Sequence, residues 1–415
     1  MLITANNPLI NTFVTRFGTG LEEKWKNWIQ FMITGICTIE KPSIQKFNKR
    51  ISEGEHWRTV YRRINRYTEL GIPLLTQFVT NLQKDQKMRM HPNGRFLIDE
   101  HIIPRTGRKM EAVSVQYATS RKAVLPAHSI LVLYYWDGTK HYPVAYLFYR
   151  RLEELKKRNL EYLFQEKNVL IRTLITQARR WGNHPILCVM DSFFFTKENV
   201  KFFKKNGISF VSRPKKSMKV KYQNQWCSLA DLAASIPDSE YCYVPVYNRL
   251  TQRTSYALIA VRDVYFHSIG HQRIVISKKK GSYLQHSKSE EEDCEDLDAF
   301  CLFVTNEVTW SGRHILEIYR TRWSIETFFE EMNQNLGFHS GRFSSLSSQI
   351  TWLDLCFLCH FFLTWSKLYR FFGSSISLLT NVGTLKQFFL IHYVSSPVVS
   401  TLPTCLPIAS SSSPS

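Results

Sequence analysis

Hydrophobic side chains recur every three or four positions through residues 1–90, which predicts a mainly helical region. Ser43 after Pro42 is a helix-start signal, and apolar residues keep helical spacing through 44–51. The run Ser52-Glu53-Gly54 breaks this pattern, and a second helix is expected over 55–67, with one side formed by Trp57, Val60, Tyr61 and Ile64. Two short helices around a glycine-containing turn are typical of a helix-turn-helix, although an ordinary pair of surface helices has the same pattern.

From Gly94 onwards the pattern changes to apolar runs of strand length. The run 95–98 ends in Asp99, and a later run, 185–190, ends in Asp191. Between them, strands over 129–135 and 142–149 are joined by a hairpin signal, Trp136-Asp137-Gly138-Thr139. The remaining elements expected in residues 91–215 are a charged helix over 152–181 with a break near Asn159, a helix over 196–206 and a strand over 208–212. This order predicts an α/β fold with a mixed sheet flanked by helices.

The rest of the chain divides into three stretches of different texture. Residues 216–300 predict a β-rich subdomain with strands over 241–247, 256–261 and 273–277, followed by the acidic run Glu290–Asp298, which suits a solvated loop or linker. Residues 301–370 begin with a strand over 300–305 and continue as a long helix from about Trp310. The Ser-rich segment 371–415 is expected to be a partly disordered tail.

Composition narrows the class of protein. The 415 residues carry 54 Lys and Arg against 34 Asp and Glu, a net charge of +20, so a polyanionic partner is expected. The longest apolar stretch, 353–365, contains Asp354 and His360 and falls short of the ~20 residues of a membrane span, so no membrane partner is expected. Without a visible export signal, nine scattered cysteines favour the cytoplasm over a disulfide framework. The string CFLCH at 356–360 resembles a haem attachment site but lies in an apolar helix, so no haem is expected.

Two short basic stretches localise part of the positive charge. Residues 41–67 contain eight Lys and Arg, and the predicted second helix carries Arg58, Arg62, Arg63 and Arg66 on its polar faces. Residues 201–221 contain eight more and no acid, including Lys215 and Lys216. Both stretches suit contacts with a nucleic-acid backbone, the alternative being solvated basic surface. Trp226 could stack on an unpaired base, but packing in the core is the favoured interpretation.

The acids that end two strands predict a metal site. Adjacent strand ends meet at one edge of an α/β sheet, so Asp99 and Asp191 should converge, whereas Glu100 should point to the opposite face. Carboxylates suit Mg²⁺, and two such ions about 3.5–4 Å apart can cleave a phosphodiester. At 100° per residue, a third acid, Glu326, shares a helix face of about 60° with Tyr319, Arg322 and Asn333. An exposed Arg–Glu helix pair would have the same spacing. His101, His141 and His339 lack ligand-like spacing and are assigned no role.

The ordered acidic segments resemble those of a known family. The strings FLIDEHIIPRTGRKME, ILCVMDSFFF and YRTRWSIETFFEEMNQNLG are similar to the three catalytic segments of DDE transposases of bacterial insertion sequences, in the subgroup with the signature Tyr-x2-Arg-x3-Glu-x6-Lys. The resemblance implies an RNase H-like fold in which Asp99, Asp191 and Glu326 hold two Mg²⁺ ions, with Mn²⁺ as a substitute. It also implies that Tyr319 and Arg322 contact the DNA ends of the element. This chain departs from the signature at its last position, where Asn333 replaces lysine.

The resemblance also implies a reaction and its partners. Such a transposase binds the terminal inverted repeats of double-stranded DNA, activates water to nick the ends, and then activates the freed 3′-OH to attack target DNA. Joining two ends implies a homodimer, in the bacterial cytoplasm at the nucleoid. Asn333 and the unusual tail leave open an inactive DNA-binding relic. An RNase H-like nuclease without strand transfer is a further alternative.

Overall fold

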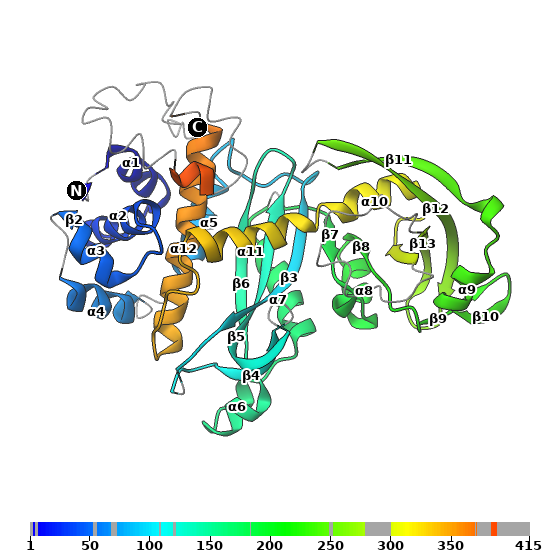
Figure 1. Ribbon diagram of the computed structural model, residues 1–415, viewed down its shortest axis with the longest axis horizontal. Coiled ribbons are helices and arrows are strands. Elements are labelled where there is room, and N and C mark those ends of the chain that lie inside the picture. The colour runs from blue at the N-terminus through cyan, green and yellow to red at the C-terminus, as the bar shows by residue number, and fades with distance from the viewer. Residues whose placement is uncertain are drawn as a thin grey trace, which may run out of the picture.

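The computed structural model has three regions side by side (Figure 1). The helices of residues 8–82 lie at one end, a mixed sheet occupies the centre, and a β-rich region lies at the other end. The structure describes residues 3–4, 7–52, 56–67, 73–107, 109–118, 122–182, 184–248, 252–278, 300–369, 371 and 383–387. The acidic run 290–298 and nearly all of the Ser-rich tail therefore lie outside the described residues.

Within the described residues, the N-terminal region contains the helices α1 (Pro8–Phe17), α2 (Glu23–Thr38), α3 (Ile44–Arg50), α4 (Trp57–Tyr67) and α5 (Leu74–Leu82). Asn7 caps α1 by accepting hydrogen bonds from the N–H groups of Leu9 and Ile10, at 2.9 and 3.0 Å. The helices bury their apolar faces against α12 (Leu346–Leu368), which crosses the molecule between them and the sheet. This region therefore shares its hydrophobic core with the rest of the protein.

The helix pair expected over 43–67 is present, with differences in detail. A two-residue strand, β2 (Ile51–Ser52), follows α3 and pairs in parallel with β1 (Ile3–Thr4). Residues 53–55, on which the expected turn falls, lie outside the described residues. In α4, Val60 and Ile64 are buried as predicted, but Trp57 is 38% exposed, because it lies in the first turn and packs against Tyr61 rather than the core.

In the part of the chain that the structure describes, twelve strands form one sheet whose main path runs β10-β9-β12-β13-β14-β8-β7-β3-β5-β4, with β6 paired to β5 and β11 paired to β12. The central strands are β3 (Arg95–Pro104), β4 (Ser114–Ala118), β5 (Ala123–Trp136), β6 (His141–Tyr149), β7 (Leu187–Met190) and β8 (Ser209–Ser212). The β3–β7 and β7–β8 pairs are parallel, whereas β5 pairs antiparallel with β3, β4 and β6. The predicted α/β mixed sheet is thus confirmed, but β4 and the first half of β5 were not anticipated.

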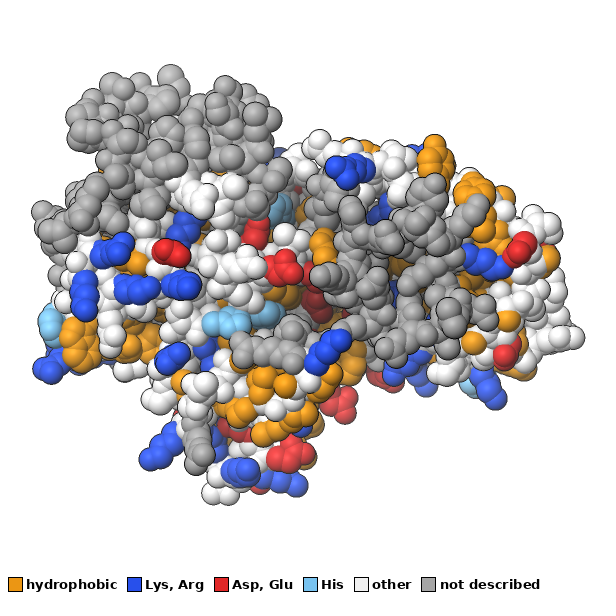
Figure 2. Space-filling model, viewed as in Figure 1, with side chains coloured by type: hydrophobic (Ala, Val, Ile, Leu, Met, Phe, Trp, Pro, Cys, Tyr) orange, Lys and Arg blue, Asp and Glu red, His pale blue; other side chains and the backbone are white. Residues whose placement is uncertain are grey.

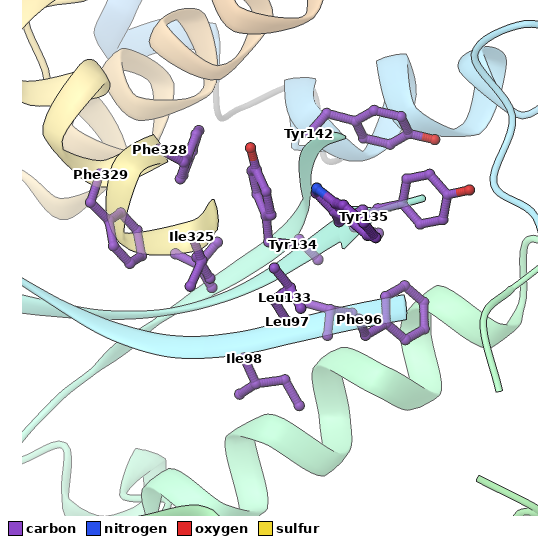
Figure 3. Close-up of a cluster of buried hydrophobic side chains, with 14 of the residues drawn as sticks. Phe96, Leu97, Ile98, Leu133, Tyr134, Tyr135, Tyr142, Ile325, Phe328 and Phe329 are labelled. Atoms are coloured by element: carbon purple, nitrogen blue, oxygen red, sulfur yellow. The ribbon is translucent and has the colours of Figure 1, made fainter. Parts of the chain in front are cut away.

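Helices cover both faces of the central strands. On one face lies α7 (Lys167–Arg179), which with α6 (Leu152–Lys156) replaces the single helix expected over 152–181, and the break falls at Asn159 as predicted, with φ +55°. On the other face lies α11 (Trp323–Asn335), whose Ile325 and Phe328 point toward the sheet (Figure 3). The rings of Phe328 and Tyr134 have centroids 4.6 Å apart. Odd-numbered β3 residues around 97–101 consequently face α11, and even-numbered ones face α7.

The β-rich region continues the same sheet rather than forming a separate one. It contains β9 (Lys219–Tyr222), β10 (Gln225–Ser228), α9 (Leu229–Ser235), β11 (Cys242–Asn248), β12 (Arg253–Phe266) and β13 (Gly270–Lys278). β13 joins this region to the centre through β14 (Phe300–Thr305), which pairs with β8. α8 (Lys197–Lys205) lies near β8, and α10 (Gly312–Arg320) lies against β11.

One helix is long enough to change an expectation. α12 has 23 residues with a mean hydropathy of 1.3 over its most apolar window, enough by length and composition to cross a membrane. The sequence-based conclusion that the apolar stretch is too short was therefore wrong. In the structure 83% of that window is buried inside the protein, because the helix packs between the N-terminal helices and the sheet. Cys356, Cys359 and His360 of the haem-like string are all buried in α12.

Candidate active site

Asp99 and Asp191 lie side by side at the centre of the sheet. In the parallel β3–β7 pair, Ile98 is in register with Met190, so the next residue of each chain segment is an aspartate. Asp191 caps the following 3₁₀ turn by accepting a hydrogen bond from the N–H of Ser192, and its own carbonyl accepts one from Ser212 Oγ at 3.1 Å. The sheet therefore brings together the two acids that the sequence singled out.

Glu100 lies on the opposite face of β3, as expected from strand alternation. Its carboxylate forms an ion pair with Lys167 Nζ of α7 at 2.6 Å and accepts a hydrogen bond from Ser129 Oγ. Both partners are on the α7 side of the sheet, away from Asp99 and α11. Glu100 is thus a structural ion-pair residue in this conformation.

The third acid is carried by a helix that differs from the prediction. The long helix expected from Trp310 is two helices, α10 and α11, separated at Thr321 and Arg322. The N–H of Arg322 donates to the carbonyl of Tyr319 at 2.9 Å, an i→i+3 bond that tightens the chain there. Thr321 Oγ1 also donates to the carbonyl of Ile318 at 2.6 Å, which competes with regular helix formation.

Arg322 joins acids from two different elements. Its Nη2 lies 2.5 Å from Glu326 Oε1, one turn later on α11, and its Nη1 lies 3.5 Å from Asp99 Oδ2 on β3. The Arg322 side chain is only 15% exposed, and its Cζ lies 5.6 Å from the centre of the Tyr319 ring. The exposed Arg–Glu helix pair considered as an alternative is therefore wrong, since this pair is buried against a third charge.

The protonation behaviour of the site reflects this crowding. Burial raises the pKa of Asp99 to about 7; Arg322 lowers it, and Glu326 and then Asp191 raise it. Burial disfavours the charged form of Arg322, but Tyr319 and the nearby carboxylates outweigh it and raise the pKa. Burial likewise raises the pKa of Tyr319 to about 12, so this phenol is neutral at ordinary pH. Asp99, Asp191 and Glu326 thus lie within electrostatic reach of one another.

Asn333, at the divergent signature position, does not share the site with Arg322. It lies two turns beyond Glu326 on α11, where its Nδ2 is 3.2 Å from His101 Nε2 on β3. Burial lowers the pKa of His101 to about 3, so its ring is neutral and Nε2 can accept this hydrogen bond. The same ring stacks on Phe329, with centroids 4.3 Å apart. Asn333 therefore helps to hold α11 against β3, two residues past Asp99.

This contact leads to a prediction about stability. We expect His101→Ala to lower the free energy of unfolding by about 1–3 kcal/mol, because it removes one stacked ring pair and one hydrogen bond. Thermal or urea unfolding would measure the change. His91→Ala is the matched control, since His91 is an exposed histidine whose side chain has no such packing. Equal stabilities of the two variants would show that the contact contributes nothing.

The chemistry of the three acids suits a hard divalent cation. Carboxylate oxygens are the ligands that Mg²⁺ and Mn²⁺ prefer. In the described residues, however, no three His, Cys, Asp or Glu side chains are close enough to form a metal-binding group as they stand. The guanidinium of Arg322 lies between Asp99 and Glu326 and keeps their oxygens on its own donors. The three carboxylates suit such an ion in their chemistry.

The other candidate nucleic-acid contacts lie on the surface of the protein. Arg58, Arg62 and Arg66 of α4 are exposed, and Arg63 is half-buried. Lys215 is exposed and Lys216 half-buried, with the Lys216 Nζ 4.7 Å from the centre of the Phe300 ring. Trp226 is 50% exposed at the edge of the β-rich region, so the prediction that it packs in the core was wrong. In the β9–β10 hairpin Cys227, paired with Val220, packs against the core, so its strand neighbour Trp226 points to the other face.

Sequence reasoning missed two contributors to this site. His101 was assigned no role, yet it follows Asp99 by two positions, which on a strand places both on one face. The two-residue spacing could therefore have predicted that His101 and Asp99 face the same side of the sheet. Arg213, within the basic run 201–221, lies near enough to Tyr319 to lower its pKa. Only the pairing of β8 with β7 and β14 brings Arg213 there, and no local pattern reports that pairing.

Comparisons with known proteins agree with part of this interpretation. Residues 165–362 match the family model described as a transposase DDE domain, a segment that includes Asp191 and Glu326 and begins after Asp99. A search of curated proteins finds no match. Among solved structures, the Drosophila P element transposase strand transfer complex is similar at 12% identity, with 54% of this chain and 52% of that chain covered and a TM-score of 0.24. This chain thus spans about half the length of that structure, and a TM-score of this size does not establish a shared fold.

Proposed function

We propose that this protein is a DDE transposase that binds the terminal inverted repeats of a bacterial insertion sequence and performs metal-dependent DNA strand cleavage and strand transfer. One observation carries the proposal. Asp99 and Asp191 come directly after residues in register on two parallel neighbouring strands, and the largely buried guanidinium of Arg322 pairs with both Asp99 and Glu326 of α11. The family match over residues 165–362 supports the same conclusion independently.

The strand order supports an RNase H-like core. β6, β5 and β3 are antiparallel neighbours, and β7 and β8 then extend the sheet parallel to β3, with α7 and α8 in the connections. This is the arrangement expected of an RNase H-like fold, with the first acid on its first strand. The β-rich insertion falls between Asp191 and Glu326, as the family resemblance implies.

Each residue of the site has a role in the proposed reaction. Asp99, Asp191 and Glu326 would hold two Mg²⁺ ions, or Mn²⁺, which when bound would supply an activated oxygen nucleophile and stabilise the leaving oxygen. Arg322 and Tyr319 would grip the phosphates of the element's end. His101 and Asn333 would hold the helix that carries Glu326 in place. The active form would be a homodimer on paired ends, in the bacterial cytoplasm.

Positive surface supports the proposed DNA partner. Figure 2 shows Lys and Arg side chains gathered over the N-terminal helices, where α4 presents Arg58, Arg62 and Arg66. The exposed Lys215 and the half-exposed ring of Trp226 would be separate contacts, on the β-rich side. Contacts of lysine and arginine with phosphate would give binding that weakens steeply with salt.

This surface yields a quantitative prediction. Replacing Arg58, Arg62 and Arg66 together with alanine should weaken binding to duplex DNA and reduce the slope of log K against log salt by about three, roughly one per lost phosphate contact. Fluorescence anisotropy between about 50 and 200 mM salt would measure the slope. A triple variant of Arg151, Lys156 and Lys157, which removes equal charge near α6, is the control. An unchanged slope in the α4 variant would place the DNA elsewhere.

A cleavage assay tests the proposed function as a whole. The wild-type protein is incubated with duplex DNA that carries the inverted repeats found on either side of its gene, with and without Mg²⁺. We expect Mg²⁺-dependent nicks at the repeat ends and joined products with a target duplex. Binding without nicking would identify an inactive relic, and cleavage without joined products would identify a nuclease.

A further inference from the structure

Arg322 occupies the position in which a bound cation would be expected. Its guanidinium bridges Glu326 at 2.5 Å and Asp99 at 3.5 Å, and the two carboxylates belong to elements far apart in the sequence. The Asp99 side chain is only 19% exposed and the Glu326 side chain 24%, so water screens their mutual repulsion weakly. In this conformation the protein supplies a compensating positive charge from its own chain, through Arg322.

We infer that Arg322 is a positioning residue that takes the place of the divalent cation in the DNA-free protein. It holds the carboxylates of β3 and α11 together, and it keeps their affinity for metal low until its side chain leaves. This inference rests on the proposed function, because it assumes that the three acids are the metal site. It adds a second state of Arg322, distinct from its contact with DNA.

The hydrogen-bonding of the Arg322 guanidinium indicates which ligand could displace it from the two carboxylates. Within the described part of the chain, the buried Nε of Arg322 has no hydrogen-bond partner. Nη1 faces Asp99, and Nη2 faces Glu326. A phosphate could accept from Nε and one Nη together, which is the stronger geometry for arginine. A DNA phosphate therefore competes with the acids for Arg322, and its arrival would free Asp99 and Glu326.

The chain offers a closely matched control pair. Arg313 and Glu317 on α10 have the same i,i+4 spacing and a 2.9 Å ion pair, but Arg313 is 51% exposed. No metal role is assigned to this pair. Substitutions there remove the same charges from the adjacent helix without touching the acid site.

The first experiment measures Mn²⁺ binding to the DNA-free full-length chain by calorimetry or electron paramagnetic resonance. Arg322→Gln should bind Mn²⁺ roughly tenfold or more tightly than the wild type, because it removes a cation next to the site. Arg322→Lys, which keeps the charge, and Arg313→Gln should both bind like the wild type. Adding Asp191→Asn to Arg322→Gln should abolish the gain. Circular dichroism confirms that each variant is folded.

The outcomes separate the inference from the proposed function. If the wild type binds Mn²⁺ as tightly as Arg322→Gln and Asp191→Asn abolishes both, the metal site stands and the role of Arg322 is wrong. If Arg322→Lys gains affinity as Arg322→Gln does, charge is not the cause and the inference also fails. If no variant shows binding that depends on Asp191, the proposed metal site itself is wrong.

The second experiment tests the competition with phosphate and contains no metal. In EDTA, Glu326→Gln should bind a short DNA duplex more tightly than Glu317→Gln, since it releases Arg322 from its closest partner. In an Arg322→Gln background the two glutamate substitutions should have equal effects, because only general charge then remains. Equal effects in the wild-type background as well would overturn the proposed competition.

Discussion

Glu326→Gln should reduce Mg²⁺-dependent cleavage of the terminal repeats by roughly a thousandfold or more. The amide keeps the size of the side chain but cannot supply the negative oxygen that a divalent cation needs. A loss of several kcal/mol of transition-state stabilisation corresponds to about this factor in rate. Single-turnover cleavage with excess protein would measure it without interference from product release.

Two controls make this result specific. Glu317→Gln removes an acid of the same type from α10 and should cleave like the wild type. Glu326→Gln should still bind duplex DNA at least as tightly as the wild type, so that the loss is one of chemistry rather than binding. A variant that cleaves within a few-fold of the wild type would remove Glu326 from the catalytic set.

The second large effect concerns a buried acid outside the site. Asp354 of α12 is 1% exposed, and it accepts hydrogen bonds from the N–H of Leu75 at 3.1 Å and from Tyr146 Oη at 2.8 Å. Burial raises its pKa to about 7, partly offset by these hydrogen bonds. Between pH 4 and 7 the folded protein therefore holds a proton that the unfolded chain has released. Stability must fall as the pH rises through this window.

The expected size of this dependence is testable. A difference of one bound proton changes the free energy of unfolding by about 1.4 kcal/mol per pH unit. Asp354 therefore lowers the free energy of unfolding by on the order of 4 kcal/mol as the pH rises from its pKa in the unfolded chain to its pKa in the folded protein. Asp354→Asn, whose side-chain amide can accept from the N–H of Leu75 and donate to Tyr146 Oη, should remove this part of the dependence of stability on pH. Part of the slope should remain, because burial also raises the pKa of Asp99 to about 7. Urea unfolding from pH 4.5 to 7.5, with exposed Glu23→Gln as control, would measure it, and a wild-type slope in Asp354→Asn would contradict it.

The fold was predictable wherever a local pattern decides it. The hairpin at Gly138, whose φ is +92°, and the break at Asn159 follow from residues that favour those backbone conformations. The break between α10 and α11 was not predictable in this way. Thr321 and Arg322 are both compatible with a helix, and neither a glycine nor a proline marks the position where the N–H of Arg322 bonds to the carbonyl of Tyr319.

Some features of the candidate site were likewise predictable from local sequence patterns, and others were not. Two apolar runs that each stop at an acid were enough to predict that Asp99 and Asp191 converge, but only β7 ends there, because β3 continues to Pro104 and Asp99 lies within it. The proposed third acid follows from the family resemblance. The orientation of Asn333 toward His101, the bridging by Arg322 and the exposure of Trp226 depend on contacts between distant segments. Periodicity reports which face a residue occupies but not which distant residue it meets there.

The position of α12 has a consequence for how this protein could change over evolution. This helix buries one side against the N-terminal helices and the other side against the sheet. Removal of the N-terminal helices would therefore expose the apolar side of α12 that they cover. A shortened chain beginning near residue 91 would expose this apolar surface to water and would aggregate rather than persist as a free catalytic core. Exchange of the N-terminal region between relatives would therefore succeed only when the facing surface of α12 is inherited with it.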